Sequence, residues 1–139
     1  MTSFVLDASV ALAWSFEDEN SPYSEFVIGS LDRKRAAAPA IWPLEVTNAL
    51  LMAIRQGRIE RADATRLIGV FDRFPLDIDR ANSRIAFEPK VLDIGLTYNL
   101  TAYDASYLEL ALRRGLPLPT QDKRLAEAAN AAGVEILQP

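Results

Sequence analysis

The sequence of 139 residues contains neither histidine nor cysteine. It therefore cannot form an imidazole general base, a Ser-His-Asp or Cys-His nucleophile, a typical zinc site or a disulfide. Lysine occurs only at Lys34, Lys90 and Lys123. If the protein is an enzyme, its carboxylates should carry the reaction, alone or around a hard cation such as Mg²⁺ or Mn²⁺.

Long apolar runs are also missing, and no stretch approaches the length of a membrane span. The N-terminus lacks the basic start of a secretory signal, so we expect a cytoplasmic protein without membrane association. Hydrophobic residues make up 50% and charged residues 24% of the chain, a globular balance. Because no linker or repeat interrupts it, residues 1–139 should form a single domain.

The clearest signal lies near the N-terminus, where three apolar residues lead into Asp7. The run Phe4-Val5-Leu6 suits a strand that a parallel sheet buries on both faces, and Ala11-Leu12-Ala13 then favours a helix. Asp7 is thus predicted at the carboxyl end of a central strand, the edge where open α/β sheets bind ligands. Alternatively, Asp7 or Ser9 only caps the next helix.

The remaining chain alternates short apolar stretches with segments of helical periodicity, which indicates an α/β fold with a mainly parallel sheet. Further strands are expected at residues 36–41, 76–79, 116–120 and 134–137. Further helices are expected at residues 22–31, 43–56, 60–74, 81–99, 101–112 and 123–132. Pro89 should kink or split the helix at 81–99. Asp77 and Asp79 alternate with apolar residues, so they should point outward from an edge strand, away from any site.

Three more acids stand where a strand or loop passes into a helix, and each has a structural explanation. Glu45 suits the dipole of a helix start. Asp104 lies three residues after Thr101, which is the spacing of a capping box. Asp122 can cap the helix that follows it.

Together with Asp7, however, these acids fall along one edge of a right-handed βαβ sheet. Four caps need not converge, whereas a metal site must. Four carboxylates brought together without a cation would repel one another, and some would stay protonated. A hard divalent ion resolves that conflict, so we predict a site formed by Asp7, Glu45, Asp104 and Asp122.

The segments around these acids are VLDAS at 5–9, EVTNAL at 45–50, YDASYL at 103–108 and TQDKRL at 120–125. In order and spacing they resemble the PIN-domain family, specifically its VapC-type toxin ribonucleases. The resemblance implies a three-layer α/β/α sandwich in which the four acids bind Mg²⁺ or Mn²⁺ for RNA cleavage. It also implies that Ser9, Asn48 and Thr120 support the acids by hydrogen bonds. The implied partners are an RNA substrate, a cognate antitoxin protein and a second copy in a homodimer.

The expected mechanism is metal-assisted hydrolysis of RNA phosphodiester bonds by water. Asp7 and Asp104 are the first choices for direct ligands. Glu45 would ligate or accept the proton of water, and Asp122 would ligate a second ion or act through water.

The net charge of -4 is unusual for a nucleic-acid enzyme, but the four acids contribute as much by themselves. Arg55, Arg58, Arg61 and Arg66 cluster around the expected helical hairpin, and Arg113, Arg114, Lys123 and Arg124 flank the third and fourth acids. Each can contact phosphate, although a solvated helix face is the more common role.

Two other functions fit the same residues. In a phosphate-transfer α/β domain, Asp7 would be a covalent nucleophile, but haloacid-dehalogenase enzymes require a second acid where this chain has Ser9. In a non-catalytic interaction module, the acids would only cap helices. Metal binding that depends on Asp7 separates a nuclease from the capping module.

Overall fold

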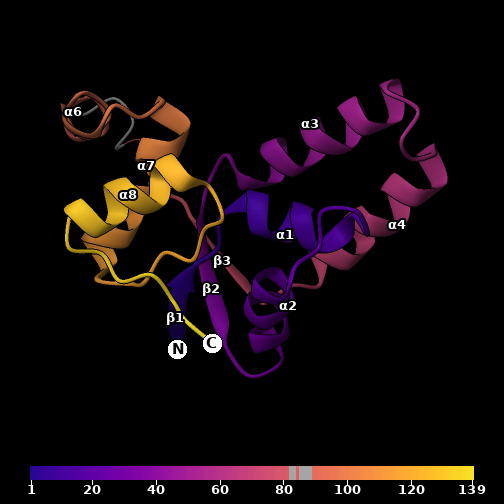
Figure 1. Cartoon of the computed structure of the whole chain (residues 1–139), viewed down its shortest axis with the longest axis horizontal. Coiled ribbons are helices and arrows are strands. Elements are labelled where there is room, and N and C mark those ends of the chain that lie inside the picture. The colour runs from indigo at the N-terminus through magenta and orange to yellow at the C-terminus, as the bar shows by residue number, and fades with distance from the viewer. Residues whose placement is uncertain (82–83, 85–88) are drawn as a thin grey trace.

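A parallel sheet lies between two groups of helices in the computed structural model, which describes residues 1–81, 84 and 89–139 (Figure 1). Strands β1 (Thr2–Val5), β2 (Arg35–Pro39) and β3 (Leu76–Asp79) pair in the order β1-β2-β3. All pairs are parallel, with Val5 opposite Ala37 and Pro39 opposite Asp79. Their carboxyl ends therefore lie at one edge of the sheet, as the sequence predicts.

The middle strand is β2 and not β1, so the expectation that Asp7 follows a central strand is wrong for the assigned sheet. Residues Ala36, Ala37 and Ala38 are fully buried. Alanine is a poor strand former, but its small side chain lets helices approach both faces of the sheet closely. Strand β1 lies at the edge of the sheet, beside β2. On its other side, Val5 N donates a hydrogen bond to Pro117 O at 2.9 Å.

Helices cover both faces of the sheet and confirm the α/β/α sandwich. On one side lie α1 (Ala8–Ser15), α2 (Pro22–Gly29), the short 3₁₀ helix η1 (Ser30–Asp32), α3 (Trp42–Arg55) and α4 (Arg61–Asp72). On the other lie α6 (Pro89–Tyr98), α7 (Ala102–Arg114) and α8 (Lys123–Ala131) (Figure 1). Helices α3 and α4 form the expected hairpin.

Helix α6 is described from Pro89 to Tyr98, and proline is well suited to the first turn of a helix. Whether Pro89 kinks or splits a longer helix stays a prediction. The preceding part of the predicted helix, at residues 82–83 and 85–88, lies outside the described residues.

Two predicted strands near the C-terminus are wrong. Within residues 89–139, which the structure describes throughout, neither 116–120 nor 134–137 forms an assigned strand. The two segments do contact each other, because Leu118 N donates to Glu135 O at 2.9 Å. Pro117 and Pro119 have no backbone N–H to donate, so a regular hydrogen-bonded ladder cannot form there.

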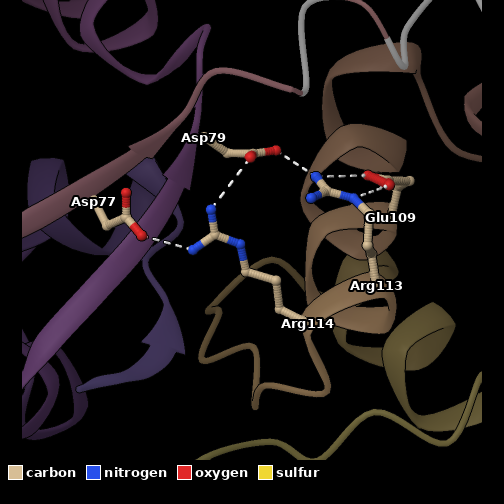
Figure 2. A network of polar contacts seen from close by, with 5 residues as sticks. All are labelled: Asp77, Asp79, Glu109, Arg113 and Arg114. Atoms are coloured by element: carbon tan, nitrogen blue, oxygen red, sulfur yellow. Dashed lines mark hydrogen bonds and ion pairs between the residues drawn. The ribbon is translucent and has the colours of Figure 1, made fainter.

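A network of ion pairs joins β3 to α7, and it overturns the prediction that Asp77 and Asp79 point away into solvent (Figure 2). Asp79 is only 3% exposed and binds both Arg113 and Arg114. Arg114 also binds Asp77 at 2.7 Å, and Arg113 binds the buried Glu109 at 2.7 Å. The two arginines are therefore committed to acids of the fold and do not form a solvated helix face.

The neighbouring arginines keep the buried carboxyl group of Asp79 ionised. Burial acts to raise the pKa of Asp79, but the hydrogen bonds and charges of Arg113 and Arg114 outweigh it and hold that pKa below its ordinary value. The carboxylate therefore stays ionised and paired throughout the neutral range.

We expect Asp79→Asn to lower the free energy of unfolding by about 2–3 kcal/mol, because it leaves two arginines without their buried partner. Asp77→Asn is the matched control, since the side chain of Asp77 is 44% exposed, and it should cost less than about 1 kcal/mol. Urea denaturation of both variants measures the difference, and equal costs would contradict the assigned role of Asp79.

Candidate active site

Four acids that the sequence singles out line one cavity of about 290 Å³. Each stands at the start of a different helix: Asp7 caps α1, Glu45 lies in the first turn of α3, Asp104 lies in the first turn of α7, and Asp122 caps α8. The chain thus brings together side chains separated by more than one hundred residues in sequence. The positive ends of four helix dipoles accompany them.

Asp7 is the most constrained of the four. It is 5% exposed, and both carboxylate oxygens accept hydrogen bonds. Oδ1 accepts from Ser9 N at 3.2 Å, and Oδ2 accepts from Ser9 Oγ at 2.7 Å and Thr120 Oγ1 at 2.8 Å. Asp7 is therefore a helix cap, as the alternative explanation held, but the hydroxyl of Thr120 also fixes its direction from a distant loop.

Asp122 acts as a helix cap, whereas Asp104 does not. Asp122 Oδ1 accepts from Leu125 N at 2.9 Å, so Asp122 does cap α8. In α7 the cap is Thr101, whose Oγ1 accepts from Asp104 N at 3.2 Å. The carboxylate of Asp104 does not complete the capping box, and it accepts no hydrogen bond from the residues that the structure describes. Capping therefore leaves the Asp104 side chain unexplained.

Glu45 is held by Tyr107, a residue that sequence reasoning missed. The Tyr107 hydroxyl donates to Glu45 Oε1 at 2.7 Å and accepts from Ala8 N at 3.3 Å. Tyr107 is fully buried in the structure, and in the sequence nothing distinguishes it from an ordinary core residue of α7. Its position three residues after Asp104, on the same helix face, was the available signal.

The three supporting residues predicted from the family resemblance behave differently. Ser9 and Thr120 both donate to Asp7, as expected. Asn48 lines the cavity but makes no hydrogen bond to a described residue. It stands one helical turn after Glu45 on α3, so its amide faces the same space.

Burial and mutual repulsion raise the pKa values of three of the acids. For Asp7, burial raises the pKa and outweighs the hydrogen bonds of Ser9 and Thr120, with the charge of Asp122 adding to the rise. For Glu45, burial raises the pKa, the bond from Tyr107 opposes this, and Asp7 and Asp104 add to it. For Asp104, burial and the charges of Asp122 and Asp7 prevail over Arg124. The acids are thus electrostatically coupled.

This donor set fits a hard divalent cation. The described residues lining the cavity supply four carboxylates and one amide, and they include no lysine or arginine to neutralise them. As the side chains lie, no three acids among the described residues form a ready-made metal cluster. The arrangement therefore suits an ion held by a few carboxylates with water completing its shell, which is how Mg²⁺ is commonly bound.

Comparison with known proteins agrees with this geometry. A family model described as the PIN domain matches residues 4–131. The chain belongs to the PIN-domain family. The resemblance found in the sequence is therefore confirmed, and the fold of the PIN domain is the one in which the four acids converge.

Three individual proteins are similar to this chain. The chain is 33% identical over 102 residues to Ribonuclease VapC1 of Mycobacterium tuberculosis, which covers 72% of each chain. It is 35% identical over 113 residues to Exonuclease VapC9 of Pyrobaculum aerophilum, which covers 76% of each chain. The crystal structure of PAE2754 from Pyrobaculum aerophilum superposes with a TM-score of 0.68 at 28% identity, covering 91% of this chain and 79% of that one.

The raised pKa values make the stability of the metal-free protein depend on pH. Above about pH 4, the pKa of the unfolded acids, the folded protein binds more protons than the unfolded chain. We therefore expect the free energy of unfolding to fall as the pH rises from about 5 to 8. Asp79, whose pKa is lowered, acts in the opposite direction, but only near and below about pH 4.

Thermal melts in the presence of a chelator measure this pH dependence. Asp7→Asn removes one coupled acid and should flatten the decline. Stability that rises steadily from pH 5 to 8 in the wild type would show that the acids are not coupled in this way.

Proposed function

We propose that this protein is a Mg²⁺- or Mn²⁺-dependent endoribonuclease and the toxin of a VapC-type toxin–antitoxin pair. The observation that carries the proposal is the convergence of Asp7, Glu45, Asp104 and Asp122 on one cavity of a PIN domain. Relatives named as VapC nucleases support the choice of nucleic acid as substrate.

In the proposed mechanism, a divalent ion held among these acids would supply a stronger water nucleophile at neutral pH and would stabilise charge on the phosphate. Asp7 and Asp104 would hold the ion. Ser9 and Thr120 keep Asp7 in one orientation, so little reorganisation is needed on binding. Asp104 has its carboxylate available, since none of the described residues donates a hydrogen bond to it.

Glu45 would accept the proton of the attacking water. Tyr107 donates to Oε1 and holds the carboxyl group, which leaves Oε2 for the proton. Burial and the neighbouring acids raise the pKa of Glu45, which makes it a stronger base at neutral pH. Asp122 keeps one oxygen on its helix cap, so its second oxygen is the one that serves the site, through water or a second ion.

The two rival functions fit the geometry less well. As a covalent nucleophile of the haloacid-dehalogenase kind, Asp7 would need a second acid at position 9, where this chain has Ser9, whose hydroxyl donates to Asp7 Oδ2 at 2.7 Å. As mere helix caps, the acids would all bind backbone N–H groups, yet Glu45 and Asp104 do not among the described residues.

The partners follow from the same proposal. The substrate is RNA, a cognate antitoxin blocks the site, the protein forms a homodimer, and it acts in the cytoplasm. Among the described residues, no helix is long and apolar enough to cross a membrane.

The decisive experiment is cleavage of end-labelled RNA in Mn²⁺ by wild type and Asp7→Asn. We expect wild type to cut internally and the variant to lose cleavage by at least about a hundredfold, while keeping its fold, because Asn can still cap α1. Asp32→Asn makes the same chemical change outside the cavity and should retain full activity. Mapping the RNA ends separates internal cuts from shortening at one end. Comparable activity in folded Asp7→Asn would refute the proposed site.

Asp104 gives the second test, because capping and metal binding predict different results for it. We expect Mn²⁺ to raise the melting temperature of the wild type by mass action and that of Asp104→Asn clearly less. Without metal, the variant should change the free energy of unfolding by less than about 1 kcal/mol.

Thr101→Ala is the matched control for the helix cap. It should cost about 1 kcal/mol of stability and leave the Mn²⁺-induced shift intact. Equal Mn²⁺-induced shifts in wild type and Asp104→Asn, measured by differential scanning fluorimetry, would remove Asp104 from the metal site.

A further inference from the structure

The acid cavity continues into a second cavity of about 550 Å³. Ser9, Leu12, Ala49 and Asp122 line both, so the two form one groove. The groove follows α1 from its N-cap, Asp7, to its C-cap, Phe16. At about 1.5 Å per residue this path is roughly 13 Å long, the length of three to four stacked nucleotides.

A single arginine stands at the far end of this groove. The guanidinium of Arg58 lies over the Phe16 ring, 4.7 Å from its centroid. Its ion pairs with Asp18 at 3.2 Å and Glu19 at 3.8 Å both use Nη2. An arginine carries five N–H donors in a planar fork, so Nε and Nη1 remain for an anion.

The acids beside Arg58 hold it only weakly. The Asp18 side chain is 74% exposed and that of Glu19 46%, and exposed ion pairs contribute little to stability. A phosphate that forms a bidentate bond with Arg58 can therefore compete with them.

Between the acids and Arg58, the groove has an apolar strip formed by Leu12, Ala13, Phe16 and Ala49. Glu19 and Gln121 line the same cavity beside this strip. Unpaired bases present apolar faces that such a surface can contact, whereas a duplex hides those faces in its stack. The groove thus contains the four acids at one end, an apolar strip in the middle and Arg58 at the other end. The distance between the acids and Arg58 corresponds to a few nucleotides.

We propose that Arg58 binds a backbone phosphate of the RNA, about three to four nucleotides from the phosphate that the four acids would cleave. This inference rests on the proposed nuclease function and adds a second contact for the RNA backbone. Since one phosphate contact carries no base information, Arg58 contributes affinity without sequence preference.

Arg58 also has a purely structural explanation, as a brace between the α1–α2 loop and the α3–α4 turn. The two explanations differ in the role of Asp18. If Arg58 is a brace, removing Asp18 should have the same effect as removing Arg58. If Arg58 binds phosphate, Asp18 competes with RNA, and its removal should leave binding unchanged or tighter.

The test measures binding of a fluorescently labelled, mixed-sequence RNA dodecamer in Mn²⁺ by anisotropy, in the cleavage-deficient Asp7→Asn background. We expect Arg58→Ala to weaken binding about tenfold and to reduce the slope of log K against log salt by about 0.7, the value for one phosphate on a single strand. Arg58→Lys should recover part of this loss. Arg61→Ala, a matched charge change on the same hairpin outside both cavities, should change binding less than twofold.

The remaining outcomes separate this inference from the proposed function. Asp18→Asn should bind as tightly as the background or more tightly. Equal effects of Arg58→Ala and Arg61→Ala, or a loss in Asp18→Asn matching that in Arg58→Ala, would each overturn the assignment of Arg58 while leaving cleavage intact. If wild type neither binds nor cleaves RNA, the nuclease function itself fails, and the proposal for Arg58 fails with it.

Discussion

Repulsion between carboxylates is the constraint on which this molecule depends. The starts of α1, α3, α7 and α8 surround one cavity, and an acid lies at each start. Strands β1 and β2 lead directly into the first two of these helices. Hydroxyl groups from Ser9, Thr120 and Tyr107 hold two of these acids, and the N-terminal ends of four helix dipoles make the local electrostatic potential more positive. Neither the hydroxyl groups nor the helix dipoles carry a full positive charge, so a bound cation would further reduce the repulsion between the carboxylates.

The sequence predicted the fold class and the four acids because both rest on local patterns. Strand, acid and helix follow one another at Asp7, and Gly115 and Pro22 stand at helix ends with the expected chemistry. The absence of histidine and cysteine then directed attention to carboxylates. The structure places those acids together, while their catalytic roles stay predictions.

What the sequence missed depends on contacts between distant segments. Asp79 alternates with apolar residues like any solvent-facing side chain, and only packing against α7 brings Arg113 and Arg114 to it. Tyr107 is a core residue, and its link to the site is the hydrogen bond from its hydroxyl to Glu45, 62 residues away in sequence. In the segment after α7, Pro117 and Pro119 have no backbone N–H to donate to a regular ladder, a loss that the pattern of apolar residues does not reveal.

Helix α7 is tied to β3 at one end and carries Asp104 at the other. Arg113 and Arg114 bind acids of β3 from the last turn of the helix, whereas Asp104 lies in the first turn, about 15 Å away at 1.5 Å per residue. Because of this length, a tilt of about 4° at the ion pairs would move the Asp104 carboxylate by about 1 Å, a displacement large enough to impair a reaction. The ion pairs at the C-terminal end of α7 therefore help to position the Asp104 carboxylate in the acid cavity.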